Sequence, residues 1–423
     1  MNQIKPSQET VKTTYQEELR RYRSYQAQQL SLDMTRGKPC AEQLDLALGV
    51  LEALDARSEF ANSNGDDCRN YGIWNGLPEM RQIFSAMMEI PPDNIILGNN
   101  SSLQMMFQCI TKGITHGYSG CLPWCQQGKI KFLCPSPGYD RHFSVTEYYG
   151  IQMIPVEMLP TGPDMDQIEA LIADDPSIKG CWCVPKYANP TGITYSDETV
   201  RRFAALRPAA KDFRIMWDNA YCVHDLTDTP ETLLSLYDEC LKTGTLDQVL
   251  FFASTSKISF PGAGVAAVGM SERNLAEMKK RTMIETIGPD KLNQLRHILF
   301  LHDFEGVKKL MQGHREILAP KFRLVTDILE KKLGGLDIAE WNDPNGGYFI
   351  NLNLLPGQAK RVVQLCKEAG VSLTEAGATF PYGQDPEDRN IRIAPSFPPL
   401  SELKQAMNVL CTAIKLASME GDQ

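Results

Sequence analysis

Short apolar runs and helical stretches alternate along the chain from about residue 92 to residue 270. The stretches between the apolar runs, such as 103–114 and 196–206, have the character of helices. Repeated alternation of strand and helix favours a mainly parallel sheet with helices on both of its faces. The apolar runs that predict strands are 94–98, 131–134, 151–156, 180–185, 213–217, 249–252 and 265–268.

The pattern changes after about residue 305, where the alternation of strand and helix becomes irregular. A long helix is predicted first, and a strand with alternating apolar and polar positions follows it. This part of the chain therefore predicts an α+β arrangement. Its expected helices are 306–332, 357–369 and 400–418, and its expected strands are 346–352, 371–373 and 391–394.

We therefore expect an α/β fold with two domains, because 423 residues suffice for a large domain and a smaller partner. The large domain is predicted to span residues 61–305 and to carry the mainly parallel sheet. Residues 306–423 would form the smaller α+β domain, and residues 1–60 would contribute to it. Within that N-terminal segment, helices are expected at 8–29 and 41–60.

Polar residues follow the ends of five predicted strands. They are Ser101, Tyr139, Asn189, Asp218 and Lys257. Open α/β sheets bind ligands in the crevice outside the carboxyl ends of their strands. We therefore expect these five side chains to converge on one crevice, and this convergence is a stronger signal than any single motif.

Lys257 comes just after the predicted strand 249–252, among small hydroxyl residues. A lysine can form a Schiff base with an aldehyde when its amine is partly neutral and held in place. On its own, the segment reads more simply as a surface lysine at the end of a strand. Ser101 and Ser102 stand at a predicted helix start, which suits either a phosphate seat or ordinary N-capping.

Composition and charge limit the partners, membrane segments and metals that the chain is expected to have. The net charge is −9 and no basic run is longer than Lys279-Lys280-Arg281, so no nucleic acid is expected. No apolar stretch approaches membrane-spanning length and the N-terminus is polar, so neither a membrane anchor nor a signal peptide is predicted. The twelve cysteines are scattered and read as reduced thiols of a cytoplasmic protein. None completes a pattern of metal ligands, so no metal is expected.

Together the motifs resemble the aspartate aminotransferase family, which are pyridoxal 5'-phosphate (PLP) enzymes of fold type I. The resemblance covers nearly the whole chain, and within the family it is closest to the MocR-type aminotransferases placed in class Ic. Any one motif is weak, whereas all seven in the family order are specific. They are Tyr71-Gly72-x3-Gly76-x-Pro78-Glu79, Ser101-Ser102, Pro137-Gly138-Tyr139, Asn189-Pro190-Thr191-Gly192, Asp218-Asn219-Ala220-Tyr221, Ser254-x-Ser256-Lys257 and Arg392 in Ile391-Arg392-Ile393-Ala394-Pro395-Ser396.

The resemblance implies a role for each matched residue at the PLP ring. Lys257 would bind the cofactor covalently and later move protons, which needs an amine of lowered pKa. Asp218 would pair with the ring nitrogen and keep it protonated. Asn189 and Tyr221 would hydrogen-bond the ring's phenolic oxygen, and Tyr139 would stack on the ring.

The remaining implied roles concern the phosphate and the substrate. Ser101, Ser102 and Ser254 would hold the phosphate, and Tyr71 would reach it from the neighbouring subunit. Arg392 would bind the substrate α-carboxylate through its guanidinium fork. Gly37, which lies between Arg36 and Lys38, and Asn189 would also face the substrate, and Phe349 would pack near it.

The sequence departs from the family in one respect. Many relatives carry a phosphate-binding arginine about eight residues after the lysine, and the segment 258–265 has none. We therefore expect a cation from elsewhere, Lys291 or Arg296, to serve the phosphate or the substrate side chain, either within the chain or across a subunit interface. Arg36 and Lys38 are further cations that could meet a distal carboxylate.

The resemblance implies a cytoplasmic homodimer with a shared active site that transfers an amino group from L-aspartate to 2-oxoglutarate by a ping-pong mechanism. Two alternatives stay open at this point. A lyase or decarboxylase could use the same fold and lysine. A PLP-binding sensor module of a transcription regulator is a third reading, although the few residues before Leu32 leave no room for a helix-turn-helix.

Overall fold

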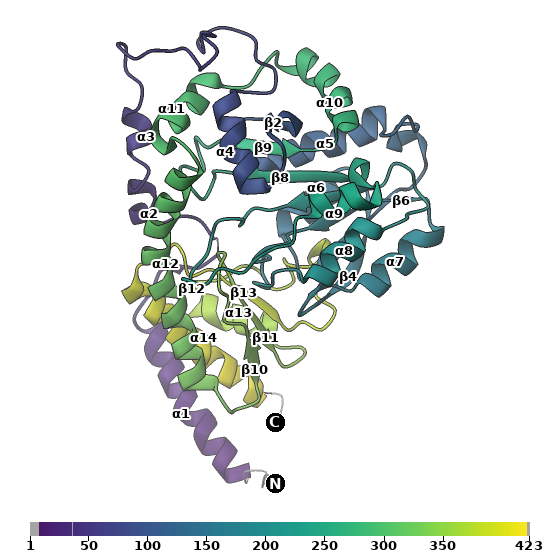
Figure 1. Cartoon of the computed structure of the whole chain (residues 1–423). Helices are drawn as coiled ribbons and strands as arrows, with labels where there is room; N and C mark the ends of the chain where they lie inside the picture. The colour runs from purple at the N-terminus through teal and green to yellow at the C-terminus, as the bar shows by residue number, and fades with distance from the viewer. Residues whose placement is uncertain (1–7, 36, 421–423) are drawn as a thin grey trace.

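A computed structural model describes residues 8–35 and 37–420 of the chain. Its centre is a sheet of eight strands in the order β2-β9-β8-β7-β6-β3-β4-β5 (Figure 1). The inner strands β8, β7, β6, β3 and β4 pair in parallel, whereas β9, β2 and β5 are joined by antiparallel pairs. The strands are β2 Ile95–Leu97, β3 Lys131–Ser136, β4 Gln152–Leu159, β5 Gly162–Pro163, β6 Ile178–Cys183, β7 Arg214–Asp218, β8 Val249–Ser254 and β9 Ala266–Gly269.

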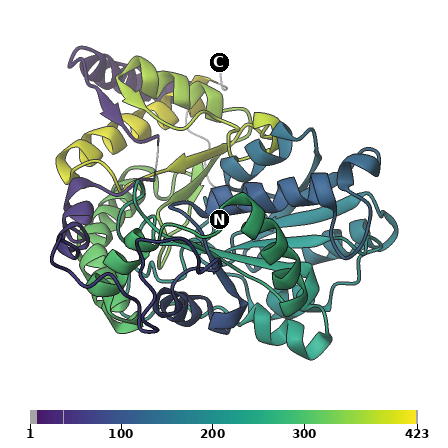
Figure 2. The ribbon, with the colours of Figure 1, turned by 90° about the horizontal axis from the view of Figure 1, so that it is seen from above.

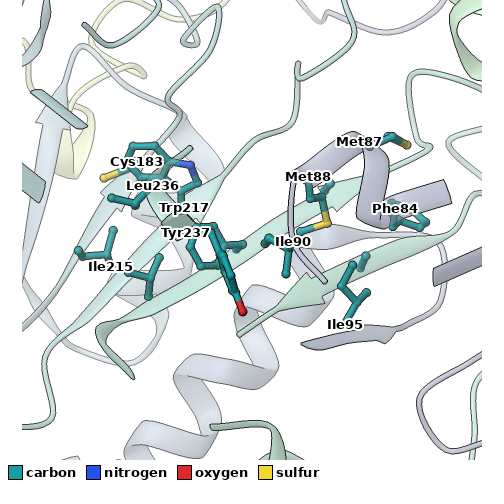
Figure 3. Close-up of a cluster of buried hydrophobic side chains, with 14 of the residues drawn as sticks. Phe84, Met87, Met88, Ile90, Ile95, Cys183, Ile215, Trp217, Leu236 and Tyr237 are labelled. Atoms are coloured by element: carbon teal, nitrogen blue, oxygen red, sulfur yellow. The ribbon is translucent and has the colours of Figure 1, made fainter. Parts of the chain in front are cut away.

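Both faces of this sheet are buried, which explains its nearly continuous apolar strands. In β7, Ile215 and Trp217 point into one core, and Met216 between them points into another. Helices lie on both sides of the sheet (Figure 2). Figure 3 shows part of the first core, where Leu236 and Tyr237 lie near Trp217 and Met87 lies near Phe84. The helices are α4 Pro78–Met88, α5 Ser102–His116, α6 Asp140–Tyr148, α7 Met165–Asp174, α8 Asp197–Ala205, α9 Leu236–Thr243, α10 Glu272–Glu285 and α11 Lys291–Leu301.

A third core joins the two ends of the chain. The strands β10 Ala339–Trp341, β11 Ile350–Leu354 and β13 Asn390–Ile393 form an antiparallel sheet, packed by α13 Ala359–Glu368 and α14 Leu400–Glu420. The N-terminal helix α1 Gln8–Gln26 reaches this core, and the Tyr22 hydroxyl donates to the Leu365 carbonyl (2.9 Å). The strand β1 Leu32–Asp33 pairs in parallel with β12 Val371–Ser372.

The helix α12 Phe304–Leu333 belongs to both parts of the molecule (Figure 1). Val307 near its start packs into the core of the large sheet, whereas Leu318 and Val325 pack into the C-terminal core. Asp303 caps the start of the helix, and its carboxylate accepts from the Gly306 amide (3.0 Å). The predicted boundaries 1–60, 61–305 and 306–423 stay predictions.

The helix expected at 41–60 is wrong in extent. The structure has two short helices there, α2 Ala41–Asp45 and α3 Gly49–Glu52, and the chain after them is irregular. Asp55 is part of the reason, because its carboxylate accepts from the backbone amide of Arg57 (2.8 Å) and from the Ser58 hydroxyl (3.1 Å). Such local bonds by an aspartate compete with the helical ladder and favour a turn.

Candidate active site

One pocket of about 290 Å³ lies where the parallel strands end. Eight residues predicted at the strand ends and beside them line it together: Ser101, Ser102, Tyr139, Asn189, Asp218, Tyr221, Ser254 and Lys257. Asp218 is the last residue of β7 and Ser254 is the last residue of β8. Because these strands are parallel neighbours, their carboxyl ends meet at one edge of the sheet.

Asp218 is buried, and its two carboxylate oxygens differ. Oδ2 lies 3.1 Å from Nε2 of His142, which is also buried. Oδ1 is buried and has no hydrogen-bond partner among residues 8–35 and 37–420. A buried carboxylate oxygen without a donor is costly, so this oxygen suits a positively charged group that enters the pocket.

His142 is held by a short chain of contacts. Its ring stacks on Trp182 with centroids 4.4 Å apart, and the Trp182 indole N–H donates to the Thr146 hydroxyl (2.8 Å). That hydroxyl in turn donates to the His142 carbonyl (2.8 Å). The orientation of the imidazole, and through it the orientation of Asp218, is therefore fixed by packing and by hydrogen bonds.

Lys257 is half-buried at the pocket wall, with its ammonium 4.9 Å from the ring centroid of Tyr221 and 5.6 Å from that of Tyr348. Burial lowers the pKa of this amine below the ordinary lysine value. The charge of Asp218 acts in the opposite direction, and the charge of Arg392 lowers the pKa further. An amine in this setting is easier to deprotonate, as nucleophilic and proton-transfer chemistry requires.

Two tyrosines enclose the pocket. Tyr221 is buried, and burial raises its pKa well above the ordinary value. Tyr139 precedes α6, and burial, followed by the charge of Asp218, raises its pKa to about 12. Both phenols therefore stay protonated near neutral pH and can donate a hydrogen bond.

Hydroxyls and the N-terminus of α5 form another part of the pocket lining. Ser101 is the residue before this helix and Ser102 is its first residue, so the free backbone amides of the helix start lie here. The Ser254 hydroxyl donates to Ser256 (3.0 Å), and the Ser256 hydroxyl donates to the Asn100 carbonyl (3.0 Å). Among the described residues that line the pocket, Lys257 is the only lysine or arginine.

Arg392 lies on β13 beside the pocket and is 6% exposed. Its Nη1 donates to Asp140 Oδ1 (2.9 Å) and to Asn189 Oδ1 (3.2 Å), and its Nη2 donates to the Thr374 hydroxyl (3.4 Å). Its Nε is buried and has no hydrogen-bond partner in the part of the chain that the structure describes. The contact with Asn189 joins Arg392 to the pocket lining.

Gly37 does not line the pocket but lies behind Arg392. The ring of Phe349 packs so closely on Gly37 that a side-chain carbon there would clash with it. The Arg392 guanidinium lies over the same Phe349 ring, 4.8 Å from its centroid. Gly37, Phe349 and Arg392 therefore form one packed layer, whereas the predicted cation Arg36 lies outside the described residues.

Tyr71 is 84% exposed and is not part of this pocket. Lys291 and Arg296 do not line it either. The Lys291 ammonium donates to the Gly72 carbonyl (3.1 Å), which fixes the loop that carries Tyr71. Lys38 points elsewhere, with its ammonium 3.9 Å from the Phe397 centroid.

The donor set of the pocket fits PLP. One pocket combines hydroxyls and helix amides, a carboxylate oxygen without a described partner, and a lysine of lowered pKa near the Tyr221 ring. Residues 8–35 and 37–420 contain no group of three or more His, Cys, Asp or Glu side chains able to hold a metal ion.

Sequence reasoning missed several neighbours of the predicted residues. His142 contacts Asp218 across 76 positions and Asp140 contacts Arg392 across 252 positions. No local pattern connects such pairs. The one available signal is that Tyr139, Asp140 and His142 stand together at a predicted strand end, where ligand contacts collect.

Comparison with known proteins finds aminotransferases that match nearly the whole chain. A family model described as "Aspartate amino-transferase" matches residues 6–422. A provisionally named aminotransferase of Mycolicibacterium smegmatis is 51% identical over 403 residues, which cover 95% of this chain and 94% of that protein. An aspartate aminotransferase of Corynebacterium glutamicum is 43% identical over 402 residues, covering 95% of this chain and 93% of that protein. A solved aspartate transaminase from Corynebacterium glutamicum has a TM-score of 0.96 at 41% identity, covering 99% of this chain and 98% of that one.

Proposed function

This chain belongs to the aspartate aminotransferase family and is a PLP-dependent aminotransferase, and from this premise we propose that it transfers the amino group of L-aspartate to 2-oxoglutarate. The observation that carries the proposal is the single pocket in which Lys257, Asp218 and Asn189 lie together, with Arg392 bonded to Asn189. The choice of aspartate follows the relative from Corynebacterium glutamicum that carries that name.

In this proposal PLP supplies the aldehyde that takes up the amino group and a ring that accepts electrons. Lys257 would bind the cofactor and carry the proton that leaves the substrate Cα. Its lowered pKa serves this task, because a proton carrier works best when its pKa lies near the working pH. The hydroxyls of Ser101, Ser102 and Ser254 and the amides at the start of α5 hold the phosphate.

Asp218 and its neighbours set the electronic state of the ring. The free Oδ1 of Asp218 would accept from the ring N–H, while His142 holds Oδ2 in place. The Asn189 oxygen accepts from Arg392, so its amide N–H groups remain as donors for the phenolic oxygen of the ring. Tyr221 provides a second donor, since its phenol stays protonated, and Tyr139 packs on the ring face.

Arg392 binds the substrate α-carboxylate, and Gly37 sets the depth of this site through Phe349. The distal carboxylate of aspartate needs a further cation. Lys291 already serves the Gly72 carbonyl, so Arg296, whose Nε lacks a partner among the described residues, is the better candidate if it comes from a second subunit. Replacement of Arg296 by alanine should then raise the KM for aspartate more than the KM for alanine.

We further propose that the enzyme is a homodimer with Tyr71 donated across the interface. Tyr71 is 84% exposed, and the apolar Ile284 (89%) and Ile287 lie exposed on the segment whose Gly288 packs on the Gly72 carbonyl. A second copy of the chain would cover this surface. Among its described residues, the structure contains no helix long and apolar enough to cross a membrane. We propose a cytoplasmic location because all twelve cysteines are free.

Mixed dimers test the shared site. Lys257→Ala and Tyr71→Ala chains are each expected to be weakly active or inactive as homodimers. A heterodimer of the two has one site with both native residues if Tyr71 acts across the interface, so mixing should restore activity. If Tyr71 acts within its own chain, no such site forms and mixing restores nothing.

The absorption spectrum of the purified protein tests the reaction itself. We expect L-aspartate to remove the visible band of the bound cofactor and 2-oxoglutarate to return it, because each substrate drives one half of the ping-pong cycle. A visible band that ignores aspartate would overturn the substrate assignment and leave PLP binding intact. Absence of a visible band with excess PLP would show that Lys257 is not the cofactor lysine.

A further inference from the structure

Three buried histidines contact three successive residues of the lysine segment. His224 Nε2 lies 3.3 Å from the Lys257 carbonyl, and His314 Nε2 lies 2.9 Å from the Ile258 carbonyl. His297 Nε2 lies 2.8 Å from the Ser259 hydroxyl. The chain has only six histidines, so half of them gather on Lys257, Ile258 and Ser259.

These histidines come from three separate parts of the fold. His224 lies in the loop after β7, His297 on α11 and His314 on α12. Each is at most 3% exposed. Contacts from three elements therefore meet on one short segment, two at backbone carbonyls and one at a side-chain hydroxyl.

The hydrogen bonds fix the protonation of the His314 ring. A carbonyl only accepts, so His314 donates from Nε2 to Ile258, and its Nδ1 accepts from the Gln43 amide (2.8 Å). This ring is therefore neutral. His297 donates from Nδ1 to the Asn293 carbonyl (2.8 Å), and its Nε2 bonds to the Ser259 hydroxyl, which can donate or accept.

His224 fits the same description. It donates from Nε2 to the Lys257 carbonyl, and its Nδ1 is buried without a hydrogen-bond partner in the described chain. Burial lowers the pKa of all three histidines below the ordinary value, and the charge of Lys257 lowers the pKa of His224 further. A second proton on His224 would have no acceptor.

Gln43 extends this arrangement to the N-terminal segment. Its amide nitrogen donates both to His314 Nδ1 and to the Tyr348 hydroxyl (2.9 Å), and its oxygen accepts from the Cys40 amide (3.2 Å). The ring of Tyr348 is the one that lies 5.6 Å from the Lys257 ammonium. The segment that carries Gly37 is thus linked, through Gln43 and His314, to the carbonyl of Ile258, the residue after the lysine.

We propose that His224, His297 and His314 are positioning residues that hold the segment 257–259, the first and the last through backbone carbonyls and His297 through the Ser259 side chain, and that Gln43 connects this segment to the N-terminal part of the chain. The proposal rests on the proposed role of Lys257, because it concerns where the Lys257 amine stands relative to Asp218 and Tyr221. A small displacement of a reacting group lowers a rate strongly even when the fold is intact. None of the three histidines lines the pocket, so none contacts the substrate.

The test compares alanine and glutamine variants of His224 and His314 with Gln43→Ala and with His116→Ala as control. His116 is exposed and bonds only to its neighbour Thr115 among described residues. Three quantities are measured on the PLP-loaded enzyme: kcat, KM, and the pH midpoint of the visible cofactor band. Thermal unfolding of the cofactor-free protein reports on the fold.

We expect His224→Ala and His314→Ala to lower kcat about tenfold or more, with KM nearly unchanged and the pH midpoint of the band shifted. The glutamine variants should lie nearer to the wild type, because the glutamine amide still donates to the carbonyl. Gln43→Ala should shift the midpoint in the same direction as His314→Ala, by less.

Folded alanine variants whose kcat and midpoint match His116→Ala would overturn the proposal. If His314→Ala does not fold, Gln43→Ala decides, since an unchanged midpoint there overturns the link through His314 and a shifted one supports it. Failure of the proposed function looks different. In that case the wild type itself shows no visible band or no response to any amino acid.

Discussion

Asp218 and Arg392 are buried charges of opposite sign at one pocket, and they are held in different ways. Asp218 ends a central strand of the large sheet, and its only described hydrogen-bond partner is His142, which leaves Oδ1 free. Arg392 lies on the small sheet and already donates to Asp140, Asn189 and Thr374. Under the proposed roles, Asp218 would gain a lasting cationic partner from the cofactor, whereas Arg392 would exchange a protein partner for the substrate carboxylate each time substrate binds.

Replacement of Asp218 should have the largest effect, because it removes a charge that acts on the reaction step. We expect Asp218→Asn to lower kcat on the order of 10²–10³-fold with a smaller change in KM, since a neutral amide does not keep the ring nitrogen protonated. Steady-state kinetics with saturating PLP measure this. A matched control is Asp212→Asn, which removes a buried carboxylate that pairs with Lys179 away from the pocket.

The control should lose thermal stability and keep kcat. If Asp218→Asn instead lost stability and kept kcat, the carboxylate would be a structural ion like Asp212, and the distinction between the two charges would be lost.

Replacement of Arg392 should act on binding. We expect Arg392→Lys to raise the KM of both the amino acid and the oxo acid by roughly 10–100-fold, because an ammonium cannot make the two parallel bonds of the guanidinium fork. Arg389→Lys, three residues earlier on the surface and paired with Glu387, is the control and should leave KM unchanged. A loss in kcat with unchanged KM would contradict a role in holding the substrate carboxylate.

The sequence predicted the pocket residues around Asp218 better than it predicted the partners of Arg392. Five pocket residues could be predicted from the pattern because each stands at or after the end of a strand of one mainly parallel sheet, and the resemblance added Ser102, Tyr221 and Ser254. Asp140, the partner of Arg392, could not be predicted, because its contact joins a helix start to a strand of a different sheet. The same holds for His142, and for the three histidines on the lysine segment.

The helix expected at 41–60 was wrong in extent, because contacts with distant residues also act on this segment. Residues 41–60 have a helical composition, but the Asp55 turn ends helical structure early, and Gln43 and Gly49 meet distant side chains, Tyr348 and Phe300. Contacts of this kind override local propensity. The resemblance to a family gave the roles of matched residues, yet it said nothing of partners that lie outside the motifs.

Replacement of Asp140 sharpens the comparison, because Asp140 is what matches Arg392. The substrate carboxylate has to compete with Asp140 Oδ1 for the guanidinium, so Asp140→Asn should lower KM by roughly three- to tenfold. The control is Asp197→Asn, because Asp197 is likewise the first residue of its helix and pairs with a surface arginine, Arg201. A rise in KM would show that Asp140 orients Arg392 for the substrate instead of competing with it.

The smallest expected effect is on the pKa of Lys257, because the charges of both Asp218 and Arg392 act on its amine. Burial lowers the pKa of its amine, Asp218 raises the pKa and Arg392 lowers it. Asp218→Asn should therefore lower the pKa of Lys257 further, and Arg392→Leu should raise it, so the free amine appears at lower pH in the first variant and at higher pH in the second. The pH dependence of Lys257 labelling by an amine reagent, followed by mass spectrometry on cofactor-free protein, measures this, with the exposed Lys308 as an internal control. Shifts of the same sign in both variants would mean that a change in burial, and not the two opposed charges, governs the amine.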